Sequence, residues 1–135
     1  MDEIDIKIQE VDWKHAEAVC NAKLIELGYD TYLPFTGGGE VDIIAVKGSE
    51  IKRVQVKSVS PNKKDVMKVH LYRSIVNFKT HAYKPYENID WFLVYDGTNI
   101  YKFEASEVEL HVSLRYTAPR NNQLKNVRMA SDFII

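Results

Sequence analysis

The sequence predicts a single α+β domain in which helices flank a mostly antiparallel, mixed β-sheet. Two patterns predict this class: an N-terminal segment has apolar residues every three or four positions, and short alternating segments separated by turn residues follow it. Size is the third observation, because 135 residues, 45% of them hydrophobic, can form one buried core but not two. We therefore expect one domain that spans residues 1–135.

The expected helix begins near Asp12 and runs to Gly28. Asp is a favourable N-cap residue, and Gly readily adopts the left-handed conformation that ends a helix. Spacings of three and four place one apolar stripe on the helix surface, which we expect to be buried. The stripe consists of Trp13, Ala16, Cys20, Leu24 and Leu27.

Seven later segments show strand-like alternation or a short apolar run bounded by turn residues. They are Thr31–Pro34, Val41–Val46, Ile51–Ser58, Val66–Tyr72, Trp91–Tyr95, Ile100–Phe103 and Leu110–Leu114. Residues 96–99, Asp-Gly-Thr-Asn, predict a hairpin between the fifth and sixth segments. Residues 73–88 fit neither the helical nor the strand pattern. One helical turn after Ser106 and a short helix around Arg128–Phe133 are also expected.

The charge distribution favours a polyanionic partner, although the net charge is only −1. Residues 47–84 carry ten basic and two acidic side chains, and residues 115–128 carry four basic and no acidic ones. Positive charge that is segregated in this way attracts phosphate backbones. The alternative is that the lysine-rich segments are solvated loops.

Cysteine content and the N-terminus narrow the class of protein. Cys20 is the single cysteine, which excludes a disulfide framework and a cysteine-rich zinc site. No apolar run approaches the roughly 20 residues of a membrane-spanning helix, and the first ten residues, MDEIDIKIQE, lack the features of a signal peptide. We therefore expect an intracellular protein, of the cytoplasm or nucleoid, without a membrane partner.

Several polar side chains stand where burial is expected. Glu17 lies within the apolar stripe of the helix, and Asp42 is the only charge in VDIIAV. Gln55 and Lys57 share one face of the next strand, because their spacing is two. If these two strands pair across their connecting turn, Asp42 meets Gln55 and Lys57 at the outer end of the pair. The alternative is that Glu17 reaches water and that Asp42 and Lys57 form a surface ion pair beside an exposed Gln55.

Together these groups form a set that suits a magnesium ion. Carboxylate, amide and carbonyl oxygens are hard ligands, and Mg²⁺ takes few protein ligands because it retains several waters. An ammonium group beside the metal can orient an attacking water or stabilise charge at a phosphate. The candidate ligands are the side chains of Glu17, Asp42 and Gln55 and the carbonyl of Val56, and the candidate cation is Lys57. Phosphodiester hydrolysis requires a nucleophilic hydroxide and neutralisation of the charge on the transition state, and such a set can supply both.

Longer stretches of the chain resemble a known family. Residues 37–58, GGGEVDIIAVKGSEIKRVQVKS, resemble the catalytic hairpin of the PD-(D/E)xK nuclease superfamily, and the preceding WKHAEAVCNAKLIELGYDTYLP resembles its Glu-bearing helix. Downstream, YENIDWFLVYDGTNIYKF and SLRYTAPRNNQLKNVRMASDF resemble a branch that includes intron-encoded homing endonucleases. The resemblance covers about residues 12–133 and implies an α/β/α layered, restriction-endonuclease-like core.

The resemblance also implies roles for individual residues. The family pattern puts the metal-binding Asp at Asp42, the helix acid at Glu17 and the catalytic lysine at Lys57. Glu40-Val41 stands where the superfamily's name has Pro-Asp, so only Asp42 remains of that pair. Gln55 stands where most members carry Asp or Glu, which resembles the Gln-x-Lys of the homing-type branch and removes one negative charge from the site.

The activity that the resemblance implies is Mg²⁺-dependent DNA endonuclease activity of the homing type, in which Mn²⁺ can substitute. A Holliday-junction resolvase of the same fold is an alternative, because such enzymes share the core and the small size. A catalytically inactive DNA-binding module is a second alternative, and a protein-interaction domain is a third. Cutting both strands of a duplex needs two active sites, so we expect a homodimer or a homotetramer.

The basic segments are expected to contact DNA phosphates, which position a duplex without reading its sequence. The candidate residues are Lys63, Lys64, Lys68, Arg73, Lys79, Arg115, Arg120, Lys125 and Arg128. The alternative is that many of these side chains are merely solvated.

Overall fold

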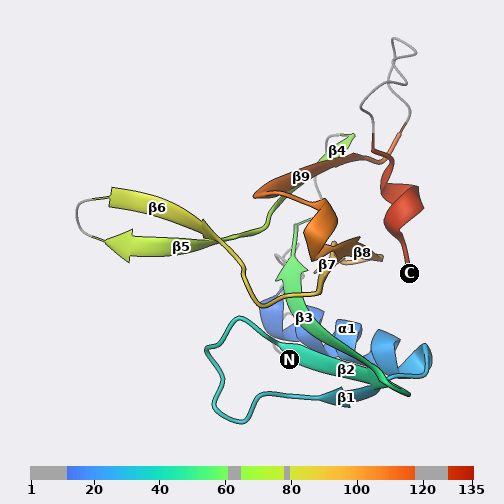
Figure 1. Ribbon diagram of the computed structural model, residues 1–135. Coiled ribbons are helices and arrows are strands. Elements are labelled where there is room, and N and C mark those ends of the chain that lie inside the picture. The colour runs from blue at the N-terminus through green and yellow to red at the C-terminus, as the bar shows by residue number, and fades with distance from the viewer. Residues whose placement is uncertain (1–11, 61–64, 78–79, 118–127) are drawn as a thin grey trace, which may run out of the picture.

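The fold is built on a five-stranded mixed sheet with the strand order β1-β2-β3-β7-β8 (Figure 1). Its strands are β1 (Asp30–Tyr32), β2 (Ile43–Lys47), β3 (Glu50–Ser58), β7 (Trp91–Tyr95) and β8 (Ile100–Glu104). Neighbouring strands are antiparallel except for β3 and β7, which are parallel. This computed structural model describes residues 12–60, 65–77, 80–117 and 128–135. The predicted α+β class, with a mixed sheet flanked by a helix, is confirmed.

Helix α1 (Trp13–Glu26) covers one face of the sheet and has nearly the predicted limits (Figure 1). The Asp12 side chain caps its start by accepting a hydrogen bond from Lys14 N at 3.0 Å. Gly28 follows its end with a φ of 95°, a left-handed value that glycine adopts without strain. The local signals in the sequence therefore set both ends of this helix.

The middle of the predicted helical stripe is buried, but its ends are not. Ala16, Cys20 and Leu24 pack with residues of β2, β3 and β7 in one core cluster. The prediction is wrong for Trp13 and Leu27, which are 61% and 41% exposed. They stand at the first position and the C-cap of the helix, where the helical stripe runs out.

The other face of β7 and β8 is covered by a second, two-stranded sheet. It consists of β4 (Val66–His70) and β9 (His111–Arg115), which are antiparallel. The side chains of Met67 and Val69 are buried there with Phe92 of β7, as the alternation in β4 predicted. Within the described residues, strands thus form the layer in which the resemblance implied further helices.

The segment for which the sequence predicted no element is mostly a β-hairpin. β5 (Tyr72–Asn77) and β6 (Thr80–Pro85) pair antiparallel and extend away from the body of the molecule (Figure 1). Two short 3-10 helices, η1 (Ala105–Glu107) and η2 (Ala130–Phe133), occupy the places of the expected helical turn and terminal helix. No helix among the described residues has the length and apolar composition needed to cross a membrane.

The predicted hairpin between β7 and β8 is confirmed, and a buried carboxylate holds its turn. Asp96 is 5% exposed and accepts hydrogen bonds from Thr98 N (2.9 Å) and Asn99 N (2.8 Å). The hydroxyls of Tyr101 (2.8 Å) and Tyr116 (3.0 Å) donate to its second oxygen. Burial alone would raise the pKa of Asp96, but these hydrogen bonds outweigh it and lower the pKa below its ordinary value.

Candidate active site

Asp42 lies immediately before β2, and both its backbone and its side chain take part in the pairing with β3. Its N–H donates to the Val54 carbonyl at 2.8 Å. Its Oδ2 accepts a hydrogen bond from Val56 N at 2.8 Å, and so the side chain satisfies a backbone donor of β3. These two bonds fix the Asp42 carboxylate against the carboxyl-terminal part of β3.

Glu17 of α1 brings a second carboxyl group close to Asp42. Two carboxylates at this proximity repel each other. Burial raises the pKa of Glu17, and the negative charge of Asp42 raises it further. Burial also raises the pKa of Asp42, although the N–H of Val56 and the charge of Lys57 act in the opposite direction. Both carboxyl groups therefore take up a proton at a higher pH than usual.

Cys20, one helical turn after Glu17, is fully buried. Burial raises the pKa of its thiol to about 12, and the charges of Asp42 and Glu17 contribute to that rise. Because a thiol coordinates metals as the thiolate, Cys20 is a packing residue at neutral pH.

Gln55 and Val56 supply the remaining oxygen atoms of the predicted ligand set. Val56 is buried on the helix side of β3, and Gln55 is half-buried on the other side. The Gln55 amide Nε2 donates to the Val56 carbonyl at 3.2 Å, which ties these two groups together.

A cavity of about 550 Å³ connects these groups, and Glu17, Asp42, Gln55 and Val56 all line it. Residues 37–39, three consecutive glycines, form another part of its wall. Gly37 and Gly38 have φ values of 66° and 75°, which favour glycine, and a Cβ atom added at any of the three would meet nothing within 4 Å. The loop therefore leaves room for a ligand to approach the carboxyl pair.

Lys57 stands beside this cavity at the same end of β3. Its positive charge is close enough to lower the pKa of Asp42. Its Nζ donates a hydrogen bond to the Tyr86 hydroxyl at 2.6 Å and lies 4.8 Å from the centroid of the Tyr86 ring. The sequence analysis did not identify Tyr86, because it lies 29 positions from Lys57 and no local pattern joins the two residues.

The structure brings together the predicted catalytic and metal-binding residues, since Glu17, Asp42, Gln55 and Val56 line one cavity. Lys57 is close enough to act on Asp42, although these residues come from a helix, from the residue before β2 and from β3. In the described part of the chain, no ion pair joins Asp42 to Lys57, which argues against the alternative of a simple surface ion pair. The catalytic and metal-binding roles of these residues stay predictions.

The donor set fits a hard divalent cation such as Mg²⁺. Glu17 and Asp42 form a pair of carboxyl groups whose mutual repulsion a bound cation would remove, and an amide and a carbonyl oxygen line the same cavity. Among the described residues, no group of three or more His, Cys, Asp and Glu side chains is placed to hold a metal ion. A cation at this site would therefore depend on Gln55 and Val56 in addition to the two carboxylates.

Four of the nine basic residues expected to contact DNA lie in the described part of the chain. Lys68 is exposed on β4, Arg115 is half-buried at the end of β9, and Arg128 is exposed just before η2. Arg73 lies in β5, opposite Lys84 of β6. The others lie outside the described residues: Lys63, Lys64, Lys79, Arg120 and Lys125.

We expect Glu17→Gln to raise the thermal stability of the metal-free protein at neutral pH, although it removes a predicted metal ligand. The raised pKa values mean that folding favours the protonated pair. This contribution is complete below the ordinary values of 4.5 and 3.8 and is lost as pH rises through the raised values. The wild type should therefore lose more stability than Glu17→Gln between about pH 4 and pH 7. Calorimetry at several pH values measures this, since each kcal/mol shifts Tm by about 3–5 °C.

Glu26→Gln is the matched control, because Glu26 is an exposed carboxylate on the same helix. It should reproduce the pH dependence of the wild type. A Glu17→Gln protein that has a lower Tm than wild type at pH 7, with an unchanged pH dependence, would show that the two carboxyl groups do not repel each other.

A helix-borne Glu, an Asp next to the start of one strand and a Gln-x-Lys on the next strand of a mixed sheet form the arrangement that the sequence resemblance implied. The family model described as PD-(D/E)XK endonuclease matches residues 9–135, and the chain therefore belongs to this family. Among solved structures, the bacterial homing endonuclease I-Ssp6803I is similar, with a TM-score of 0.74 and 16% sequence identity. The match covers 93% of this chain and 88% of that one, and at this identity it shows a shared fold. No curated protein matches the chain.

Proposed function

We propose that this chain is a Mg²⁺-dependent DNA endonuclease that hydrolyses phosphodiester bonds and acts as a homing endonuclease does. The observation that carries this proposal is the pair of carboxyl groups, Glu17 and Asp42, that lines one cavity, with Lys57 beside it. Partly buried carboxylates that lie close together are stabilised when a divalent cation neutralises their charge. Membership of an endonuclease family supports the reaction class, and the homing endonuclease with the same fold supports the homing role.

The side chains of Glu17, Asp42 and Gln55 and the carbonyl of Val56 would hold the ion, and Mn²⁺ would substitute for Mg²⁺. The bound ion would lower the pKa of a water and neutralise charge on the phosphate. Lys57 supplies a positive charge that orients the attacking water or stabilises the charge that develops at the scissile phosphate. Asp42 is held in place for this task by its hydrogen bond from Val56 N.

DNA would contact the nine predicted basic residues, four of which lie in the described part of the chain. In support, Lys68 and Arg115 lie on the paired strands β4 and β9, and Arg115 N donates to the Arg128 carbonyl at 2.8 Å. Lys57 is the last residue but one of β3. In Figure 1 the arrowhead of β3 points toward the side where β4 and β9 and the β5–β6 hairpin lie. A homodimer or homotetramer would supply an active site for each strand of a duplex.

A cleavage assay tests this function. Purified protein is incubated with supercoiled plasmid, a library of linear duplexes and a four-way junction, with Mg²⁺, with Mn²⁺ or with a chelator. We expect nicks or double-strand breaks that need the cation, and DNA binding that weakens as salt rises because phosphate contacts release counterions. Salt-dependent binding without cleavage of any of these DNAs would contradict the endonuclease and favour a DNA-binding module.

Gln55→Glu tests whether Gln55 is a metal ligand. The variant adds a carboxylate to the cavity, so we expect the affinity for Mg²⁺ to rise roughly 10-fold, as ligand charge generally dictates. Isothermal titration calorimetry with Mg²⁺ and Mn²⁺ measures this change. Ser49→Glu is the control, because it adds the same charge at the exposed turn before β3 and should leave the affinity unchanged. Equal affinities for Gln55→Glu and wild type would show that Gln55 does not bind the ion.

A further inference from the structure

Tyr86 makes contacts with Lys57 that none of the roles above explains. The Lys57 Nζ donates to the Tyr86 hydroxyl at 2.6 Å, which is short for a charge-assisted hydrogen bond. The same Nζ lies 4.8 Å from the centroid of the Tyr86 ring, and this distance together with the hydrogen bond places it at the hydroxyl edge of the ring. The hydroxyl oxygen is therefore the atom that holds the ammonium group at Tyr86.

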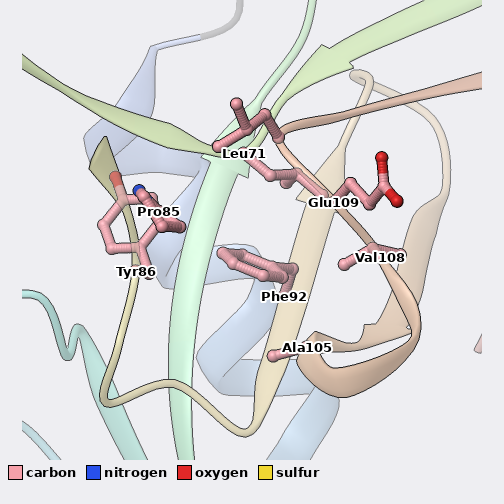
Figure 2. Close-up of a pocket in the computed structure, with 8 residues that line it drawn as sticks. Leu71, Pro85, Tyr86, Phe92, Ala105, Val108 and Glu109 are labelled. Atoms are coloured by element: carbon pink, nitrogen blue, oxygen red, sulfur yellow. The ribbon is translucent and has the colours of Figure 1, made fainter. Parts of the chain in front are cut away.

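The position of Tyr86 is itself fixed by packing. It follows Pro85, the last residue of β6, and its ring meets Phe92 edge-on, with centroids 5.7 Å apart and an interplanar angle of 64°. Phe92 is 4% exposed and is paired in register with Gln55 of β3. Tyr86 and Phe92 also line a mainly apolar cavity of about 390 Å³ (Figure 2). The hydroxyl that accepts the hydrogen bond from Lys57 is thus positioned by packing against β7, the strand next to β3.

Lys57 would have stronger partners if it were free to reach them. Its side chain is a long and flexible stem with a strongly hydrated charge, and carboxylates attract that charge more than a phenol does. Asp42 is near enough to feel the charge of Lys57, yet in the described part of the chain no ion pair joins Lys57 to Asp42 or Glu17. An ammonium group on these carboxylates would occupy oxygen atoms that a divalent cation needs.

We propose that Tyr86 is a positioning residue that holds the Lys57 ammonium away from the Glu17–Asp42 pair and so keeps the carboxylate oxygens available to a divalent cation. The proposal rests on the proposed function, because it assumes that these carboxylates bind the ion. Tyr86 has no contact with the cation or the phosphate in this role. It acts through Lys57 alone.

Tyr86→Phe is the informative variant. It keeps the ring and its packing against Phe92 but removes the oxygen that accepts the hydrogen bond from Lys57. Isothermal titration calorimetry with Mg²⁺ alone, without DNA, is expected to show about 10-fold weaker binding, a typical loss when a group that orients a metal site is removed. Lys57→Met should bind Mg²⁺ at least as tightly as wild type. The double variant should resemble Lys57→Met, because Tyr86 has nothing left to hold.

Cleavage kinetics give a second readout. The Mg²⁺ concentration for half-maximal cleavage should rise about 10-fold in Tyr86→Phe, while kcat at saturating Mg²⁺ changes less. Tyr116→Phe is the matched control: it also removes a half-buried hydroxyl that is bonded to a side chain, at 3.0 Å from Asp96, and it should lower stability without changing the affinity for Mg²⁺.

Two results would overturn the proposal for Tyr86 alone. One is an unchanged Mg²⁺ affinity in Tyr86→Phe. The other is an equal loss of Mg²⁺ affinity when Tyr86→Phe is introduced into wild type and into Lys57→Met. A different result would overturn the proposed function as well: wild type and Asp42→Asn would bind Mg²⁺ with the same affinity, or neither would bind it.

Discussion

Asp42→Asn is expected to abolish cation-dependent DNA cleavage while the fold and DNA binding persist. Asn retains an oxygen that can accept the hydrogen bond from Val56 N at the place where Asp42 does so. It lacks the negative charge that a hard cation requires, and metal ions contribute several kcal/mol to such reactions. Each 1.36 kcal/mol is a factor of 10 in rate, so we expect a loss on the order of 10³-fold or more.

Plasmid nicking and a mobility-shift titration measure the two halves of this expectation. Asp30→Asn is the matched control, because Asp30 is an exposed carboxylate at the start of β1. The control should cleave like wild type, and both variants should bind DNA. If Asp42→Asn cleaved within a few-fold of wild type, Asp42 could not be the principal metal ligand. If it lost DNA binding as well, the loss of cleavage would not show a catalytic role.

Lys57→Met is expected to lower kcat by about 10²–10³-fold, the usual cost of removing a group that stabilises charge in a transition state. Methionine keeps most of the length of the side chain and removes the ammonium group, so packing near Tyr86 changes little. Binding of Mg²⁺ should persist because Lys57 is not a ligand. Single-turnover cleavage at saturating Mg²⁺ and DNA isolates this effect on the chemical step.

Lys52→Met is the matched control for Lys57→Met. Lys52 lies on the same strand, near its other end, and its Nζ is 5.6 Å from the centroid of the Trp91 ring. We expect its kcat to equal that of wild type. A Lys57→Met enzyme with an undiminished kcat would leave this lysine without a catalytic role and would also remove the reason for Tyr86 to hold it.

The sequence was a good guide to the elements that carry strong local signals. Asp12 and Gly28 mark the ends of α1, and Asp96-Gly97 marks the turn between β7 and β8. The β5–β6 hairpin was not predictable because its strands pair with each other and lack a regular apolar face in the sequence.

The site could be predicted to a similar extent. Gln55 and Lys57 are two positions apart, and Asp42 is the single acid in an apolar segment. These two features were enough to predict that Asp42 lies near both residues. The proximity of Glu17 to Asp42 depends on how α1 crosses the sheet, and the spacing of apolar residues in the sequence does not predict that crossing. Tyr86 reaches Lys57 only because the chain returns from the hairpin beside β3, so its contact is a property of the tertiary structure.

The most direct test of this account is a crystal of the wild-type protein grown or soaked with Mn²⁺, in which anomalous scattering locates the ion. We expect one strong peak at bonding distance from carboxylate oxygens of both Asp42 and Glu17, with Lys57 still at Tyr86. A crystal in which Mn²⁺ binds elsewhere and leaves Glu17 and Asp42 without a bound ion would contradict the assignment of a metal-dependent nuclease site to this pair.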